Sequence, residues 1–170
     1  YAATGAIGER NIETRIRVDS FSKVRVVLET ADSKLHMASR FVAGAGGCSA
    51  PAAKDADEAL ASLGKMQVRA LTDANRGAEW REAVVMIRHP SFTGMQVNPG
   101  TGAYTPAWYV EEIDIKRGET PIMRIRGGIS ISENPQVRFN FKSTGADVIE
   151  VSARDTKGNV FSGRSAGNGS

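Results

Sequence analysis

Short runs in which apolar and polar residues alternate fill the second half of this chain, and they constrain its fold more than any other feature. Between Met66 and Arg164 the sequence shows no helical period, and Gly, Pro and Asn separate the runs. Such a pattern is typical of an antiparallel sandwich of short strands. We expect seven strands, at Met66–Leu71, Glu82–Arg88, Trp108–Ile115, Pro121–Arg126, Val137–Phe141, Val148–Asp155 and Val160–Arg164.

The region before residue 48 alternates in the same way but contains fewer strands. Residues 14–28 predict two strands, and the turn Ala31–Lys34 leads into a third, Leu35–Val42, which forms a hairpin. Three strands are too few for a sandwich. Because an open strand edge must be covered or paired, we expect the hairpin to join the sandwich or to exchange with a second copy. Phe41 is expected to be buried at its base.

A short helix is predicted between these regions. Ala56, Ala59, Leu60 and Leu63 have helical spacing, and Gly64 stands where a helix ends. The nearby charged residues predict a solvated face rather than a metal site; they are Lys54, Asp55, Asp57 and Glu58. The chain thus divides into a β region (1–51), a helical linker (52–65), a sandwich (66–164) and a disordered tail (165–170).

Composition excludes several classes of function. The 22 basic and 19 acidic residues are spread along the chain without a dense patch, which argues against nucleic-acid binding. No apolar run is long enough to span a membrane. Since Tyr1 is neither an initiator methionine nor the start of a signal peptide, we expect that a leader was removed or that the chain is a piece of a longer one.

The single cysteine, Cys48, follows three glycines: Gly44, Gly46 and Gly47. One cysteine cannot form an internal disulfide. A free cysteine is usually a small buried hydrophobe, but glycine packs poorly and is costly to order. We therefore expect these glycines to form a flexible arm that carries an accessible, nucleophilic thiol.

Signatures of catalysis are scarce. His36 and His89 lie in different regions and outside metal-binding spacings. His36 is a surface residue or one that contacts the thiol, and His89, which precedes Pro90, begins a loop. The chain has no nucleophile elbow, phosphate-binding loop or Cys-x-x-Cys pair. We expect a carrier without catalytic machinery or cofactor, whose mobile thiol reaches several partner sites.

Several segments resemble a known pair of families. Residues 18–24 and 40–48, ending in Gly-Gly-Cys, resemble the end of SoxY, the sulfur-binding subunit of a thiosulfate-oxidising carrier. Residues 87–94, 131–139 and 155–161 resemble its sandwich partner, SoxZ. The chain is thus similar to the fused SoxYZ-like carriers associated with quinoprotein dehydrogenases.

The resemblance implies a periplasmic carrier that binds sulfur covalently on Cys48, as an S-thiosulfonate or persulfide. It also implies partner enzymes that oxidise sulfur: a haem enzyme, a hydrolase and a sulfane dehydrogenase. The expected fold is mainly β: an immunoglobulin-like, SoxZ-like antiparallel sandwich preceded by a partial SoxY-like hairpin region and a short linker helix. The chain departs from the family where Ser49 and Ala50 replace the two glycines that follow the cysteine.

Two other functions compete with the carrier. The first is an immunoglobulin-like accessory or binding module of a periplasmic quinoprotein dehydrogenase, in which Cys48 is incidental. The second is a homodimer linked through the thiol, because an exposed unpaired cysteine can join two chains.

Overall fold

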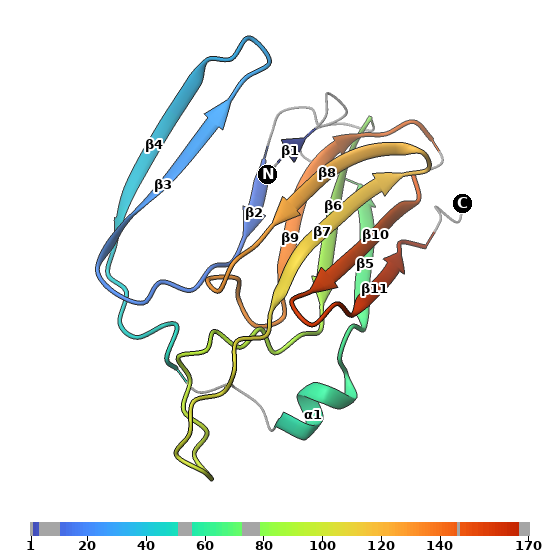
Figure 1. Ribbon diagram of the computed structural model, residues 1–170. Helices are drawn as coiled ribbons and strands as arrows, with labels where there is room; N and C mark the ends of the chain where they lie inside the picture. Colours follow the sequence, from blue (N-terminus) through green and yellow to red (C-terminus); the bar gives the residue numbers. More distant parts are fainter. Residues whose placement is uncertain (1, 4–10, 51–55, 73–78, 146, 167–170) are drawn as a thin grey trace.

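Two antiparallel sheets pack face to face in the computed structural model, and a separate hairpin projects beside them (Figure 1). The structure describes residues 2–3, 11–50, 56–72, 79–145 and 147–166. The strands are β1 (Ala2–Ala3), β2 (Ile12–Thr14), β3 (Ser22–Glu29), β4 (Leu35–Val42), β5 (Met66–Thr72), β6 (Trp80–Ile87), β7 (Val110–Arg117), β8 (Thr120–Arg126), β9 (Gln136–Lys142), β10 (Ile149–Asp155) and β11 (Val160–Arg164). One sheet has the order β1-β8-β7-β10-β11 and the other β2-β9-β6-β5.

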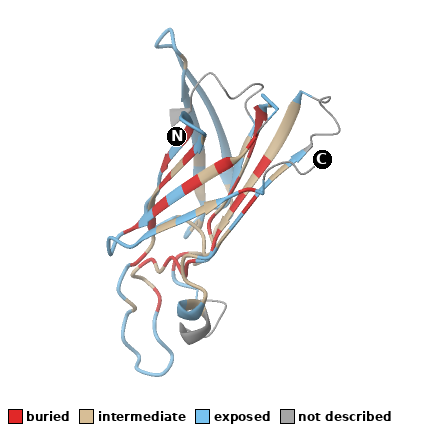
Figure 2. Ribbon diagram, turned by 90° about the vertical axis from the view of Figure 1, so that its right-hand side faces the viewer, coloured by how far each residue is buried: buried red, intermediate tan, exposed pale blue. Residues whose placement is uncertain are grey.

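The core lies between these two sheets and follows the alternation in the sequence (Figure 2). On β6 and β9 every second side chain points inward and is buried; these are Ala83, Val85, Ile87, Val137, Phe139 and Phe141. Isoleucines and valines of the opposite sheet face them. The alternation breaks on β8, where adjacent Ile122 and Met123 are both buried, near an irregularity in its pairing with β7.

These observations confirm the predicted fold class, a mainly β immunoglobulin-like sandwich. All seven strands predicted for the second half are present, with ends shifted by up to two residues. The helix α1 spans Ala56–Ala61, and Gly64 has the expected positive φ of 74°. None of the described helices is long and apolar enough to cross a membrane.

The N-terminal region contributes a short strand to each sheet of the sandwich. Strand β1 pairs with β8, and β2 pairs with β9. The strand predicted for residues 14–18 therefore lies earlier and ends at Thr14. Beyond it, Arg17 leaves the strand conformation to donate hydrogen bonds to loop carbonyls. The described strands before the hairpin, β1 and β2, are thus part of the two sheets of the sandwich.

The hairpin β3–β4 contradicts the expectation that it adds onto the sandwich. Among the residues that the structure describes, its two strands pair only with each other. Its apolar side chains are exposed on both faces, among them Val26, Leu35 and Met37. Phe41 is 63% exposed rather than buried, and its ring stacks on Phe21 at 6.2 Å. The alternation predicted the strands correctly but could not show that nothing described here covers them.

The C-terminal tail differs from the prediction at its first residue. Ser165 is buried, its N–H donates to the Ile149 carbonyl at 2.9 Å, and its hydroxyl accepts from the Ile149 N–H at 3.0 Å. These bonds continue the pairing of β10 with β11. Residues 167–170 of the predicted tail, like residues 52–55 of the predicted linker, lie outside the described residues.

Two phenylalanine substitutions compare how much a ring in the sandwich and a ring in the hairpin contribute to the free energy of unfolding. Phe139→Ala should destabilise the protein by about 3–5 kcal/mol, because the ring is fully buried between the sheets. Phe41→Ala should change the free energy of unfolding by less than about 0.5 kcal/mol, because its ring is already exposed. Urea unfolding followed by tryptophan fluorescence measures both. A cost for Phe41→Ala comparable to that for Phe139→Ala would show that the hairpin is covered in solution.

Candidate functional site

Cys48 lies in a tight turn formed by residues 46–50, called here the Cys48 turn. The carbonyl of Gly46 accepts the N–H groups of Ser49 and Ala50 at 3.2 and 3.0 Å. Gly46 has a φ of 66°, which favours glycine because a side chain would be strained there. The turn directly follows β4, so the hairpin leads the chain to the thiol.

Both halves of the chain hold this turn in place. From the N-terminal side, the Asp19 carboxylate accepts the Cys48 N–H at 3.1 Å, and the Asp19 carbonyl accepts the Gly46 N–H at 2.6 Å. From the sandwich side, the Thr93 hydroxyl donates to the Cys48 carbonyl at 2.6 Å. The thiol residue therefore sits between two segments that are far apart in the sequence.

The glycines allow a close approach rather than a free arm in this structure. A Cβ on Gly44 or Gly47 would lie 2.7 or 2.6 Å from the Val18 carbonyl oxygen, so only glycine fits against that backbone. Cys48 is 4% exposed. The expectation of an exposed thiol on a flexible arm is thus not met here, because the turn is docked against residues 18–20 and Thr93. A thiol-linked dimer also needs a more exposed sulfur than this one.

The loop that holds Cys48 from the sandwich side spans residues 89–96 and is itself fixed by several buried contacts. Thr93 accepts the Met95 N–H at 3.1 Å, and its own N–H donates to the Gln96 side chain at 2.9 Å. The Trp108 N–H donates to the Phe92 carbonyl at 2.9 Å. Thr93 and Gln96 are both buried. The Thr93 hydroxyl is therefore presented to Cys48 from a rigid position.

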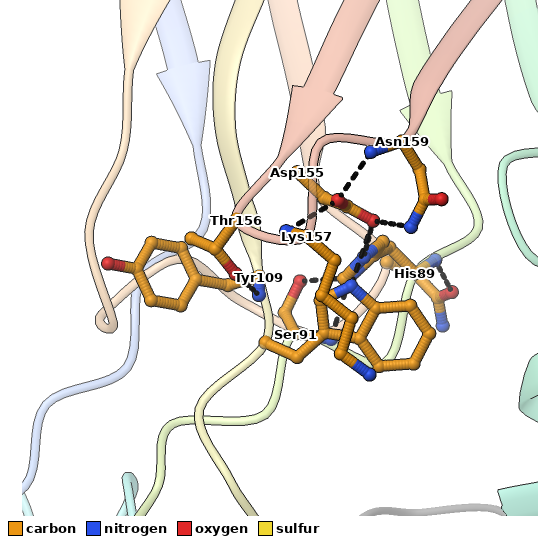
Figure 3. A network of polar contacts seen from close by, with 9 residues as sticks. His89, Ser91, Tyr109, Asp155, Thr156, Lys157 and Asn159 are labelled. Carbon is orange, nitrogen blue, oxygen red and sulfur yellow. Dashed lines mark hydrogen bonds and ion pairs between the residues drawn. The ribbon is translucent and has the colours of Figure 1, made fainter.

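Behind this loop, the buried Asp155 carboxylate collects donors from three parts of the chain (Figure 3). It accepts the Trp108 indole N–H and the Asn159 side-chain N–H at 2.8 Å each, and the Lys157 backbone N–H at 2.9 Å. Burial alone would raise the pKa of Asp155, but the hydrogen bonds from Asn159 and Trp108 hold it below its usual value. Asp155 is therefore a stable buried anion.

His89 links Asp155 to the loop. Its Nδ1 accepts the Ser91 backbone N–H at 3.0 Å, so the ring proton is on Nε2, which faces Asp155 at 3.4 Å. Burial lowers the pKa of His89, although Asp155 partly opposes the shift, and the ring is neutral. Ser91, His89 and Asp155 follow one another as in a hydrolase triad, but Ser91 is fully buried. All three residues are buried, and their hydrogen bonds hold the loop.

Burial and two charged side chains, Asp19 and Arg17, set the pKa of Cys48. Burial raises the pKa of the Cys48 thiol, the Asp19 carboxylate raises it further, and Arg17 lowers it in part. The Arg17 guanidinium is fixed by hydrogen bonds to the Ser91 and Ile131 carbonyls, both at 2.7 Å. The docked thiol is therefore protonated at neutral pH.

The structure separates the other predicted polar residues from the thiol. His36 is exposed on β4, opposite Leu28, near the far end of the hairpin. His89 lies in the predicted loop but is buried. In the described part of the chain, no three His, Cys, Asp or Glu side chains gather where they could hold a metal ion.

Sequence reasoning missed the two residues whose hydrogen bonds hold the Cys48 turn, Asp19 and Thr93. Thr93 belongs to the segment His89–Gly94 that carried the resemblance to SoxZ, and Asp19 belongs to the segment that resembles SoxY. Both residues therefore lie in segments that carried the family resemblance. Their contacts, however, join positions up to 45 residues apart, and no local pattern predicts such a pairing.

The fold and this docked thiol define a β-sandwich protein whose single cysteine is held between its N-terminal region and a loop of the sandwich. Residues 68–166 match the family described as sulphur oxidation protein SoxZ, and residues 1–48 match the family described as sulfur oxidation protein SoxY. The chain belongs to the SoxZ family, and with the preceding SoxY match it is a fused SoxYZ-like sulfur-oxidation protein. No curated protein matches it.

Substitutions at the two charged neighbours should move the pKa of Cys48 in opposite directions. Asp19→Asn removes the negative charge that raises this pKa but keeps an acceptor for the Cys48 N–H, so the pKa should fall. Arg17→Gln removes the positive charge that lowers it, so the pKa should rise. The pH dependence of alkylation by iodoacetamide measures both, because only the thiolate reacts.

Asp32→Asn, which changes an exposed carboxylate at the tip of the hairpin, is the matched control and should leave the alkylation profile unchanged. If the midpoint of the alkylation profile of Asp19→Asn lay at the same pH as that of the wild type, or at a higher pH, the electrostatic assignment would be contradicted.

Proposed function

We propose that this chain carries sulfur compounds, which it binds covalently on Cys48 and presents to partner enzymes that oxidise them. It takes up an intermediate of thiosulfate oxidation in the periplasm and performs no catalysis itself. The partners are sulfur-oxidising enzymes or a quinoprotein dehydrogenase system. The SoxY and SoxZ families, which act with partner enzymes in sulfur oxidation, support this proposal.

The position of the thiol carries the proposal. The SoxY match ends at Cys48, and the SoxZ match begins on β5, at residue 68. The Cys48 turn lies between Asp19 of the first matched region and Thr93 of the second. A cysteine with only a packing role would not require glycine-specific contacts with Val18 on the one side and a rigid hydroxyl on the other.

Loading of the thiol with sulfur needs no catalytic group on this chain. When the Cys48 thiolate attacks a polysulfide, a new S–S bond forms on Cys48 and an S–S bond of the polysulfide breaks. The shorter polysulfide leaves with the electron pair of the broken bond, so the exchange needs no external oxidant. Loading with thiosulfate itself also releases two electrons, which a haem-containing partner would accept.

Loading does require the Cys48 turn to leave its docked position, because Cys48 is buried, with 4% of its surface exposed. Three hydrogen bonds, to Asp19 and Thr93, hold the turn. Each such bond contributes about 0.5–1.5 kcal/mol net. A detached, accessible turn is therefore a minor state within reach of thermal fluctuation, and a partner that binds it would increase its population.

Intact-mass measurement after treatment with polysulfide tests the function. The wild-type chain should gain the mass of one or more sulfur atoms, and reduction should remove them. Cys48→Ser should gain nothing, while Ser152→Ala, at an exposed serine on β10, should load like the wild type. A folded wild-type chain that gains no sulfur would overturn the proposal in favour of an accessory module.

Loosening the docked turn should accelerate loading. Thr93→Val removes the hydroxyl that donates to the Cys48 carbonyl while keeping the side-chain shape, so loading should become several-fold faster. Thr101→Val alters a threonine in an exposed turn and serves as the control. Stopped-flow or quenched mass measurements give both rates. Equal rates for the Thr93→Val and wild-type chains would show that the docked turn does not limit access.

A further inference from the structure

Arg17 lies beside the Cys48 turn, and the proposed carrier chemistry does not use it. Its neighbour Val18 is in close contact with Gly47, where a Cβ would lie 3.3 Å from the Val18 nitrogen and 2.6 Å from its carbonyl oxygen. On the next residue, the Asp19 carboxylate accepts the Cys48 N–H. The segment 17–19 therefore runs directly against the segment 46–48.

The side chain of Arg17 is fixed in this position. Its Nη1 donates to the Ser91 and Ile131 carbonyls, both at 2.7 Å, and its backbone N–H donates to the Ser130 carbonyl at 2.8 Å. Ser91 is two residues from Thr93, which holds the Cys48 carbonyl. The Arg17 guanidinium and the Cys48 turn are thus attached to the same rigid loop.

This anchoring leaves part of the guanidinium available. Within the residues that the structure describes, Nε and Nη2 of Arg17 donate no hydrogen bond. Guanidinium remains charged at any physiological pH, and its planar donors suit oxyanions. Carboxylates of Asp19 and Glu133 lie in the same neighbourhood and would repel an anion. Arg17 is the charge that can offset them.

We propose that Arg17 makes the Cys48 site selective for anionic sulfur cargo, such as a thiosulfonate whose negative end would lie beside the guanidinium. This inference rests on the proposed function of Cys48 and adds a specificity-determining residue to it. Arg17 does not react. It favours a charged adduct over a neutral one, because opposite charges attract across a partly buried surface.

Two reagents that modify the same thiol separate charge from access. Tetrathionate, a dianion, reacts with the Cys48 thiolate to give Cys48–S–S–SO3⁻ and releases thiosulfate. Methyl methanethiosulfonate, which is neutral, gives Cys48–S–S–CH3 and releases methanesulfinate. In each step one S–S bond forms, one S–S bond breaks, and the leaving group takes the electron pair. Both rates depend in the same way on the fraction of Cys48 present as thiolate and on the fraction of chains in which the turn is open. These two factors therefore cancel in the ratio of the rates.

In Arg17→Gln the rate ratio of tetrathionate to methyl methanethiosulfonate should fall by about threefold or more, as expected for the loss of one nearby positive charge. Asp19→Asn should move the ratio in the opposite direction, because a repelling carboxylate is lost. Arg15→Gln, an exposed arginine two residues away, is the matched control and should leave the ratio unchanged. Molar salt should reduce the effect of Arg17→Gln by screening.

The outcomes separate the two proposals. If neither reagent modifies Cys48 in the folded chain, the carrier function itself fails. If both reagents modify Cys48 but the ratio is the same for wild type, Arg17→Gln and Arg15→Gln, the carrier function stands and the role of Arg17 is overturned. Arg17→Lys, which keeps the charge, should retain most of the selectivity, and its loss there would also contradict the electrostatic explanation.

Discussion

The candidate site depends on the hydrogen bonds that the buried Asp155 carboxylate accepts. This carboxylate joins the turn after β10 to Trp108 and to His89, and through His89 it fixes the backbone at Ser91. A buried anion is costly unless it is fully hydrogen-bonded, and here backbone, indole and amide donors satisfy it. The loop that it stabilises then supplies the Ser91 carbonyl, which accepts a hydrogen bond from Arg17, and the Thr93 hydroxyl, which holds Cys48.

The docked turn gives the glycines around Cys48 a second role. Glycine allows movement, but it also allows a backbone to approach another backbone more closely than any side chain would permit. Gly44 and Gly47 use this property against Val18. The proposed carrier function would use both properties, because a bound sulfur compound would be buried between encounters with partners and exposed during them. The same residues that would let the segment move also let it pack tightly when it returns.

Much of the sandwich could be predicted from the sequence, whereas the site could not. Alternation on strands such as β6 and β9 is a local pattern, and it predicted both strands to within two residues of their ends. The exposure of Phe41 and the burial of Cys48 depend on what lies opposite them in space, which no run of neighbouring residues records. Asp19 and Thr93 were missed for the same reason, since a sequence does not show which polar residues form hydrogen bonds to distant parts of the chain.

The two short N-terminal strands have a consequence for the architecture of the fusion. Strand β1 extends one sheet and β2 extends the other. The region that matches SoxY therefore forms part of both sheets of the sandwich that matches SoxZ. A sandwich without this region would expose the unpaired edges of β8 and β9 to solvent, where strands of other chains could pair with them. Because both regions belong to one polypeptide, the pairing of β1 with β8 and of β2 with β9 does not depend on protein concentration.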